Sequence, residues 1–399
     1  MRILHVVPSY YPAVRYGGPI RSVHGLARAL AGRGHDVHVY TTNVDGPSSA
    51  DVPLQTPINL DGVAVWYFAT AMGRRLYRSL DMNRALSMNV AGFDIVHAHS
   101  VFLWPTTAAA RAARAHRVPY LIAPRGMLVA DLIRRKSWLA KRAWMAAFER
   151  RNVAAAAAVH ATSEVEAQDI ERLGLRYQRL IIVPNGIEAP EPNAGAHHGS
   201  MGRERQTILF LGRVNWKKGL DRLISAMVHL PGADLVIVGD DHEYYRATMQ
   251  ALAEKLGVAS RVRFLGPVHG SEKWAMLKSA QVLALPSYSE NFGNVILEAM
   301  AVGCPVVVTP EVGLADVVRA SGAGLVIPGN PERLAWALHR ILANPDTARA
   351  MGQAGRKAVA ERFTWEGVAG QMEQAYQQIT SDWTPTTRAV LARSSPWLL

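Results

Sequence analysis

The sequence has few of the features that mark secreted, redox-active or membrane-spanning proteins. It contains a single cysteine, Cys304, in 399 residues, so no internal disulfide can form. The neighbours of this cysteine are apolar and predict a buried, inert thiol, which favours a cytoplasmic protein. Met1 leads directly into the strand-like run RILHVV, so we expect no cleaved signal peptide. No apolar run reaches the roughly 18 residues that a membrane-spanning helix requires.

Several widespread ligand-binding motifs are also missing. The chain has no GxGxxG and no GxxxxGK[ST], and these absences argue against a dehydrogenase and against a P-loop NTPase. No Asp-x-Asp follows a strand-like run. The pair Asp240-Asp241 comes nearest, and we interpret it as part of a loop. The sequence therefore predicts neither a metal site nor a bound cofactor.

Positive charge is present in excess and is distributed unevenly. The formal net charge is +12 at pH 7. Residues 1–190 contain 23 Lys and Arg against 13 Asp and Glu, whereas the remaining residues contain 21 against 19. The basic field of the first half fits an anionic membrane, a nucleic acid or an acidic substrate. No nucleic-acid-binding module is recognisable, so we expect no nucleic-acid partner.

Strand-like apolar runs alternate with longer helical patterns along the chain, which predicts parallel sheets covered by helices on both faces. In the first half, the predicted strands lie near 2–7, 36–42, 63–67, 94–98, 119–123, 156–161 and 179–183. In the second half, they lie near 207–212, 234–239, 261–265, 281–285, 304–308 and 324–327. The longest helix predicted in the first half spans 132–151.

A segment without periodicity, residues 184–206, separates the two halves and is rich in Pro, Gly, Asn and Ala. We therefore predict an α/β fold with two Rossmann-like, doubly wound domains, residues 1–183 and 207–364, joined by this linker. A further helix and tail occupy residues 365–399. Two such domains facing each other form a central cleft, and ligands of these sheets bind at the carboxyl ends of the strands.

Two cations follow the first strand of the second domain, in the stretch GRVNWKKG. Arg213 lies at the strand end, and Lys218 comes five residues later at the start of a helix. Two cations beside a helix N-terminus form an anion site, and a diphosphate suits it because Arg binds phosphate bidentately. The alternative is a solvated charge cluster at a helix start.

Two carboxylates surround a tight turn after a later strand, in SYSENFGNVILEAM. Glu290 precedes the turn, and Glu298 lies in the following helix. The turn consists of Asn291, Phe292, Gly293 and Asn294. Its glycine permits close backbone approach to a ligand, and carboxylates accept hydrogen bonds from the vicinal hydroxyls of sugars and riboses. In the alternative interpretation, Glu298 is a surface residue paired with a nearby arginine.

Three strand ends of the first domain carry further candidates. Gly17 and Gly18 precede a helix, where a backbone without side chains can approach phosphate. His99 ends the strand of DIVHAHS, with His97 packed beneath it, although such a histidine is also common as a structural residue. Arg125 follows the strand of APRGM and is a candidate for an acidic or phosphate-bearing acceptor.

Together these motifs resemble the retaining glycosyltransferases of the GT-B fold, family 4 (glycosyl transferases group 1). Glu290 and Glu298 match the E-x7-E element of that family, and the sequences VPNGI at 183–187 and HxH at 97–99 occur in the family's order. The stretch PRGML at 124–128 is similar to a bacterial polysaccharide-assembly branch. The resemblance covers nearly the whole chain.

The resemblance implies a transferase that takes a sugar from a nucleotide-diphosphate sugar. The matching Arg213 and Lys218 would bind the donor diphosphate, Glu290 the donor sugar and Glu298 the ribose. The turn amides would hold sugar hydroxyls or phosphate, and His99 would contact the sugar near the reacting carbon. The last helix of such enzymes returns to the first domain, as residues 365–379 would here.

Two other functions stay open at this point: a nucleotide-sugar epimerase of the same fold and a non-catalytic sugar-binding protein. The basic stretch 134–151 bears on the choice, because it combines seven Arg or Lys with Trp138, Trp144 and Phe148. This composition suits a membrane interface, but it also suits a helix packed on the sheet with its charges in water. We expect peripheral contact with the inner face of an anionic cell membrane and a lipid-linked or glycan acceptor.

Overall fold

The computed structural model describes the chain except residues 14–16, 71–72, 136, 189–205, 242–243 and 384–399. The described chain forms two compact units. Unit 1 contains Met1–Gly186 and the chain from Trp365 onward, and unit 2 contains Ile187–Thr364. Most of the predicted linker 184–206 lies outside the described residues, as does the tail after Trp383.

Unit 1 is built on an eight-stranded sheet, counted over its described residues, in the order β10-β9-β8-β7-β1-β2-β6-β5. All neighbours are parallel except β5, which pairs antiparallel with β6 at the edge. Its strands are β1 (Arg2–Val6), β2 (Asp36–Thr42), β5 (Pro57–Leu60), β6 (Val63–Phe68), β7 (Ile95–His99), β8 (Tyr120–Ala123), β9 (Ala158–Ala161) and β10 (Leu180–Ile182). The short strands β3 (Val44–Asp45) and β4 (Ser48–Ser49) form a separate hairpin.

Helices cover both faces of this sheet, and a separate buried apolar cluster packs on each face. They are α1 (Gly18–Gly32), α2 (Leu80–Asn89), α3 (Trp104–His116), α4 (Ala130–Arg135), α5 (Trp138–Trp144), α6 (Arg150–Ala154), α7 (Glu164–Arg172) and α15 (Trp365–Asp382). A π-helical turn, Met145–Glu149, connects α5 and α6. The helix predicted over 132–151 is therefore divided into several segments.

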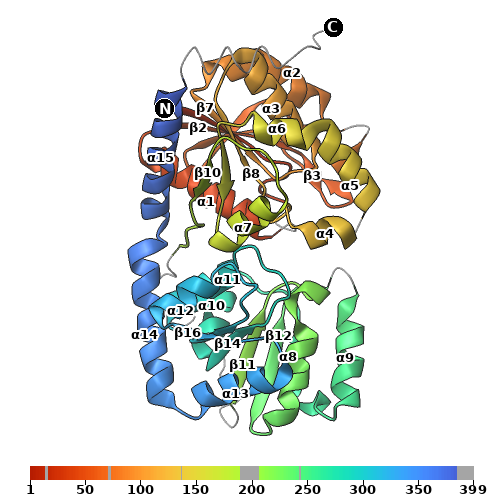
Figure 1. Ribbon diagram of the computed structural model, residues 1–399, viewed down its shortest axis with the longest axis vertical. Coiled ribbons are helices and arrows are strands. Elements are labelled where there is room, and N and C mark those ends of the chain that lie inside the picture. Colours follow the sequence, from red (N-terminus) through yellow and green to blue (C-terminus); the bar gives the residue numbers. More distant parts are fainter. Residues whose placement is uncertain (14–16, 71–72, 136, 189–205, 242–243, 384–399) are drawn as a thin grey trace. The chain divides into compact units, whose positions relative to one another are not determined.

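The last described helix, α15, belongs to unit 1 and packs against α1 (Figure 1). Its first residue, Trp365, lies so close to Gly25 and Gly186 that a Cβ at either glycine would overlap the indole ring. Further along the helix, Arg33 of α1 donates hydrogen bonds to Glu373. The phenol of Tyr376 is fully buried beneath the sheet strands. The chain thus crosses into unit 2 and returns to complete the core of unit 1.

Unit 2 contains a six-stranded parallel sheet, again counted over its described residues, in the order β13-β12-β11-β14-β15-β16. The strands are β11 (Gln206–Leu211), β12 (Ala233–Val238), β13 (Val262–Leu265), β14 (Val282–Leu285), β15 (Val306–Val308) and β16 (Gly324–Val326). Helices flank the sheet on both sides, as Figure 1 shows. They are α8 (Leu220–Ala226), α9 (Tyr245–Lys255), α10 (Gly270–Ser279), α11 (Asn294–Val302), α12 (Ala315–Ser321), α13 (Pro331–Leu342) and α14 (Pro345–Arg362).

Each sheet has a point at which the winding direction reverses. In unit 1 this point lies between β1 and β7, and in unit 2 it lies between β11 and β14. Helices on opposite faces diverge there, and the open space at the carboxyl ends of the strands is the usual ligand site of such sheets. Most of the candidate residues follow these strands, but Arg125 follows β8, the neighbour of β7.

The alternation of strands and helices predicted from the sequence is confirmed, with strand boundaries shifted by at most two residues, whereas the helix predicted over 365–379 extends to Asp382. The edge strand β5, the short strands β3 and β4 and the helix α12 were not predicted. Strand β5 is short and contains Pro57, which weakens a strand signal, and it pairs only through its neighbour β6. Helix α12 has seven residues, too few for a clear periodic pattern.

Candidate active site

The first cation pair of unit 2 lies in the loop after β11. Arg213 is exposed and makes no hydrogen bond or ion pair to any residue that the structure describes. Lys218 ends a single 3₁₀ turn, Trp216–Lys218, in which the amide of Lys217 donates to the side-chain oxygen of Asn215. The next residue, Gly219, has φ of +65°, and a Cβ there would overlap the carbonyl oxygen of Pro286 after β14. This glycine therefore lets the two loops at the switch point approach each other.

Glu290 lies in the loop after β14, and both its backbone amide and its backbone carbonyl are hydrogen-bonded. Its amide donates to the carbonyl oxygen of Glu311 over 3.1 Å, and its carbonyl accepts from the amide of Gly313 over 2.8 Å. Its carboxylate forms an ion pair with the ammonium group of Lys218. Both side chains are mostly buried, at 15% exposed for the lysine and 18% for the glutamate. The structure thus joins two predicted site residues from the strands on either side of the switch point.

The turn after Glu290 ends in the N-terminus of α11. Gly293 has φ of +94° and occupies the N-cap position, so no side chain caps this end of the helix. Phe292 turns into the core of unit 2, at 4% exposed, and fixes the turn on the sheet. The partial positive charge of a helix N-terminus favours an anion or a hydroxyl oxygen beside these amides.

Glu298, one turn into α11, has a partner that the sequence did not suggest. Its carboxylate pairs with Lys273 of α10 over 2.8 Å, whereas the alternative interpretation expected an arginine. Lys273 is 8% exposed, and its ammonium group lies 4.5 Å from the centre of the Trp274 ring. A lysine on a short helix 25 residues away gives no periodic signal, so only the packing of α10 on α11 reveals this pair.

A second feature missed by sequence reasoning surrounds Tyr288, two residues before Glu290. Its hydroxyl donates to Asp221 over 2.7 Å, and the guanidinium of Arg222 lies 3.5 Å from its ring centre. Burial raises the pKa of Tyr288, and the hydrogen bond to Asp221 adds to this, since both favour the neutral phenol. The cluster connects α8 to the β14 loop. Its members come from two distant segments of the chain, so no local sequence pattern predicts it.

In unit 1, the glycine pair lies where the sequence predicted it. Gly17 has φ of +73° and is the N-cap of α1, and Gly18 is the first residue of the helix. No side chain caps this N-terminus. Residues 14–16, which precede the pair, lie outside the described residues.

His99 ends β7 as predicted, but it is buried, with 1% of its surface exposed. Its Nε2 lies 2.9 Å from Nδ1 of His5 on β1, and its Nδ1 lies 3.2 Å from a terminal nitrogen of Arg125. Burial, followed by the charge interaction with Arg125, lowers the pKa of His5 to about 3. Burial likewise holds the pKa of His99 well below its ordinary value, so both rings are neutral.

Arg125 is half-buried at the end of β8 and has φ of +55°, a backbone conformation that is costly for a residue with a side chain. Its second terminal nitrogen donates to Asn185 over 2.9 Å. Burial lowers the pKa of its guanidinium to about 10, so the group remains a cation at neutral pH. The loop is held by Glu166, which accepts the amide of Gly126 over 2.7 Å.

A second histidine pair lies behind the first. His97 Nε2 lies 3.2 Å from Nδ1 of His160, and His97 Nδ1 lies 2.7 Å from the hydroxyl of Tyr376 on α15. His160 bonds through Nε2 to the carbonyl oxygen of Val183 over 2.8 Å. That carbonyl only accepts, so the protons are placed in turn: His160 donates to Val183, His97 donates to His160, and Tyr376 donates to His97.

Ring nitrogens of His5, His97 and His99 lie within 4.8 Å of one another, a spacing compatible with a metal ion. The hydrogen bonds argue against such a centre, because both nitrogens of His97 and both of His99 already have protein partners. The neighbouring guanidinium of Arg125 would also repel a cation. The cluster therefore fits a hydrogen-bonded support better than a metal site.

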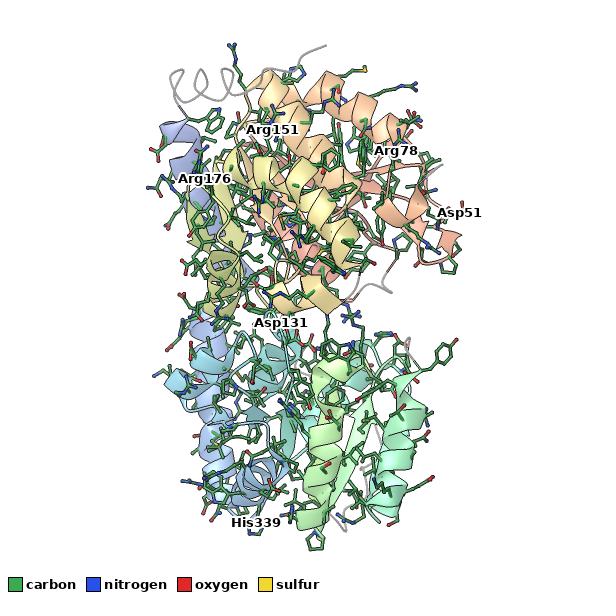
Figure 2. The ribbon with its side chains drawn as sticks, turned by 45° about the vertical axis from the view of Figure 1, so that its right-hand side comes forward. Asp51, Arg78, Asp131, Arg151, Arg176 and His339 are labelled. Carbon is green, nitrogen blue, oxygen red and sulfur yellow. The ribbon has the colours of Figure 1, made fainter. Side chains whose placement is uncertain are left out.

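The basic stretch of unit 1 has an exposed aromatic end. Trp138 and Leu139 of α5 are 45% and 66% exposed, and the Arg142 guanidinium lies 5.3 Å from the Trp138 ring centre. Trp144 and Phe148 instead pack against Trp104. Arg78 and Arg151 add further charge at the surface of unit 1 (Figure 2). None of the helices formed by the described residues is long and apolar enough to cross a membrane.

Comparison with known families and sequences places the chain among glycosyltransferases. The family model "Glycosyl transferase 4-like domain" matches residues 17–186, and "Glycosyl transferases group 1" matches residues 200–358. A D-inositol 3-phosphate glycosyltransferase of Xylanimonas cellulosilytica is 31% identical, with 95% of this chain and 96% of that protein covered. An uncharacterized glycosyltransferase of Methanocaldococcus jannaschii is 28% identical over 94% of this chain and 98% of its own length.

Solved structures share the fold. A sucrose-phosphate synthase from Thermosynechococcus elongatus has a TM-score of 0.76 at 24% identity, covering 96% of this chain and all of its own. WaaG, a glycosyltransferase involved in lipopolysaccharide biosynthesis, has a TM-score of 0.67 at 22% identity, covering 95% of this chain and 99% of its own. The chain accordingly belongs to the glycosyl transferases of group 1, has the GT-B fold and is a hexosyltransferase-type enzyme of class EC 2.4.

Proposed function

We propose that this enzyme is a retaining glycosyltransferase of cell-surface polysaccharide biosynthesis. It transfers a sugar from a nucleotide-diphosphate sugar to a lipid-linked or glycan acceptor. The observation that carries the proposal is the buried ion pair of Lys218 and Glu290, which joins the loops after β11 and β14 at the switch point of unit 2. A group 1 glycosyltransferase needs cations there, because the leaving nucleoside diphosphate gains negative charge as the sugar departs.

Different residues of unit 2 bind different parts of the donor. Arg213 is exposed and binds the diphosphate with its guanidinium, while Lys218 adds a point charge. Glu290 accepts hydrogen bonds from hydroxyls of the sugar, and the helix N-terminus that follows Asn291 and Phe292 presents amides, with Gly293 and Asn294 at its cap. Glu298, held by Lys273, accepts from the ribose. For Gly17 and Gly18, at the uncapped N-terminus of α1 in unit 1, we propose a role in binding phosphate through backbone amides.

The reaction forms a bond between the acceptor oxygen and the anomeric carbon and breaks the bond from that carbon to the phosphate oxygen. The acceptor attacks from the face that the diphosphate leaves, so the anomeric configuration is retained. The acceptor proton passes to the departing phosphate oxygen, so no side chain acts as a covalent nucleophile. Proton NMR of the product tests this point, because the coupling constant of the anomeric proton reports the configuration.

The donor is best identified by stabilisation. The fold neighbour HepE of Anabaena was solved with UDP and with UDP-glucose, whereas a mannosyltransferase of Mycobacterium tuberculosis, 35% identical over 48% of this chain, is described as GDP-mannose-dependent. A thermal-shift panel of UDP-, GDP- and ADP-sugars is therefore the direct experiment. The preferred donor should raise the melting temperature by mass action, by an amount equivalent to about 2.7 kcal/mol at 100 times its Kd. If no nucleotide sugar stabilises the protein, the proposal fails.

The acceptor side is assigned to unit 1. Arg125 is the cation that we propose for an acidic or phosphate-bearing group of the acceptor. The exposed Trp138 and Leu139, with the cations around them, are proposed as a peripheral contact with an anionic membrane that presents a lipid-linked acceptor. Release of free nucleoside diphosphate only when acceptor is present would distinguish transfer from epimerisation and from simple sugar binding.

A further inference from the structure

We infer that three residues of unit 2 form a clamp that holds the loops after β11 and β14 together when the donor diphosphate separates Lys218 from Glu290. The clamp consists of Asp221, Arg222 and Tyr288. These three are positioning residues, because they act on the donor only through Lys218. This inference rests on the proposed function, in which Lys218 binds the diphosphate.

The ion pair of Lys218 and Glu290 cannot by itself hold the two loops during the reaction. Both side chains are mostly buried and face each other in the absence of substrate. In the proposed complex, the ammonium group binds phosphate and the carboxylate binds sugar hydroxyls, so the attraction between the two no longer joins the loops. Another set of contacts must therefore keep the loops in register when both groups bind the donor.

Tyr288 joins the two loops through both its backbone and its side chain. Its amide donates to the carbonyl oxygen of Lys217 over 2.7 Å, one residue before Lys218. Its hydroxyl donates over 2.7 Å to the carboxylate of Asp221, which lies in the first turn of α8. The two bonds lie on either side of Lys218 in the chain, so the residue that carries the ammonium group is held between them.

Arg222 extends the clamp to a third loop. Its guanidinium lies 3.5 Å from the centre of the Tyr288 ring and donates to the carbonyl oxygen of Pro286 over 3.2 Å. Gly329 also lies beside this guanidinium, so close that a Cβ there would overlap it. Because Gly329 follows β16, the clamp joins three loops at the carboxyl ends of the strands of unit 2.

The clamp is complete without the ion pair, because none of its contacts uses the side chain of Lys218 or Glu290. Burial and the bond to Asp221 raise the pKa of Tyr288, so its phenol remains a hydrogen-bond donor at neutral pH. The second carboxylate oxygen of Asp221 is buried and has no partner among the described residues. The bond from the phenol is therefore needed to compensate for the burial of this carboxylate.

Binding of a nucleoside diphosphate to the full-length protein tests the inference. The probe is whichever of UDP, GDP and ADP raises the melting temperature of the wild type most. Tyr288→Phe keeps the ring beside Arg222 but removes the hydroxyl, and it should weaken binding about five-fold, as expected for one hydrogen bond. In a Lys218→Met background the same substitution should have no further effect, because the clamp acts through the lysine. Asp221→Asn retains an oxygen for the phenol and should bind within about two-fold of the wild type.

A second arginine of unit 2 provides a matched control. Arg222→Met should weaken binding by about five- to ten-fold, because the stacked guanidinium and its bond to the β14 loop are both lost. Arg340→Met should leave binding unchanged, although the Arg340 guanidinium likewise lies near an aromatic ring, 5.4 Å from the centre of Trp336 on α13.

Two binding results would overturn the inference while leaving the proposed function intact. The first is unchanged binding in Tyr288→Phe. The second is additivity of the Tyr288→Phe and Lys218→Met losses, which would show that the tyrosine acts independently of the lysine. A wild type that binds none of the three nucleoside diphosphates would instead contradict the proposed function.

Hydrogen exchange followed by mass spectrometry tests the clamp without any substrate. Lys218→Met should leave exchange in the loops after β11 and β14 nearly unchanged, since the clamp persists without the ion pair. Tyr288→Phe should accelerate exchange in both loops but not in α13. If exchange in Lys218→Met is as fast as in Tyr288→Phe, or faster, the ion pair holds the loops and the inference is wrong irrespective of any activity.

Discussion

The two units place opposite kinds of polar groups at equivalent points of similar sheets. At the switch point of unit 2, the partners are ions: Lys218 pairs with Glu290, and nearby Lys273 pairs with Glu298. At the switch point of unit 1, they are neutral rings: His5 on β1 faces His99 on β7, and one cation, Arg125, lies at the end of the next strand. Topology alone thus does not decide the chemistry of a strand end.

The two units differ in whether the buried polar groups at the switch point carry charge. Paired ions remain charged when buried and can exchange one partner for a phosphate or a hydroxyl, which suits a leaving diphosphate. Neutral imidazoles carry no such charge, but two nitrogens per ring at fixed angles hold a single guanidinium in one plane. Unit 2 is therefore suited to stabilising the charge that develops on a leaving diphosphate. Unit 1 is suited to holding a single guanidinium in a fixed position.

The largest expected effect on turnover comes from removing one charge of the ion pair at the switch point of unit 2. Lys218→Met should reduce turnover by about 10²–10³-fold, because one donor to the departing phosphate is lost and Glu290 is left without its partner. Steady-state release of nucleoside diphosphate measures it. Lys255→Met, at an exposed position of α9 in the same unit, is the matched control and should leave turnover unchanged. Equal turnover in both variants would contradict the role of the ion pair.

The buried, neutral histidines of unit 1 predict that the stability of the fold depends on pH. Burial lowers the pKa of His5 and His160 to about 3, against an ordinary value of 6.5, and lowers those of His97 and His99 as well. Below pH 6.5 these histidines bind protons in the unfolded chain but not in the folded chain. Stability therefore falls as pH falls from 6.5 toward 3. Each histidine contributes up to about 1.4 kcal/mol per pH unit.

Urea unfolding of unit 1, followed by fluorescence at pH 7.5, 6.5 and 5.5, measures this loss of free energy. His160→Gln removes one titrating group and should flatten the slope between pH 6.5 and 5.5. A stability that is constant over this range would show that the histidines are protonated in the folded state.

A smaller effect should distinguish the role of the Glu298–Lys273 pair from that of the Lys218–Glu290 pair. Glu298→Gln should weaken donor binding about 10-fold, because the ribose loses a charged acceptor, and should also destabilise the fold, because Lys273 is left buried without its partner. Adding Lys273→Met should restore the melting temperature but leave donor binding weak. Recovery of both properties in the double variant would assign Glu298 a purely structural role.

The basic surface of unit 1 offers a comparison with the nearly neutral half of the chain. Trp138→Ser should reduce binding to vesicles containing anionic lipid by about five-fold, since roughly 1 kcal/mol of interfacial contact is lost. Trp336→Ser is a close control, because Trp336 of unit 2 is 48% exposed and likewise has an arginine guanidinium, from Arg340, 5.4 Å from its ring centre. Co-sedimentation should show no effect of the control, and neutral vesicles should bind neither variant nor the wild type.

The smallest effect concerns Cys304, which is 4% exposed, and burial raises its pKa to about 12. A thiol-specific reagent at pH 8 should therefore not react with the native protein but should modify one thiol per chain after unfolding. Rapid modification of the native protein would place the cysteine at an accessible surface. The test also reports whether the core of unit 2 stays closed under the conditions of the other experiments.

Much of the fold was predictable because parallel strands buried on both faces leave a strong apolar signal. The strands predicted near 36–42 and 281–285, for example, occur as Asp36–Thr42 and Val282–Leu285. The helix predicted over 132–151 was a poorer prediction, since its periodicity does not reveal the π-helical turn at Met145–Glu149. The buried carboxylate of Glu149, at the end of that turn, accepts a hydrogen bond from the amide of Phe102 in the loop between β7 and α3, a contact that periodicity does not indicate.

The sequence by itself determined the two-sheet α/β architecture and the strand ends at which the candidate residues lie. The physical reason is that both depend on local order: apolar periodicity sets the strands, and the loop after each strand is adjacent to it in the chain. Tertiary structure decided the partners, because the contacts of Lys218 with Glu290, of Glu298 with Lys273 and of His99 with His5 join residues 72, 25 and 94 positions apart. Such pairs form only when segments distant in sequence pack together, either as neighbouring strands of a sheet or as neighbouring helices, and no local pattern encodes which of them meet.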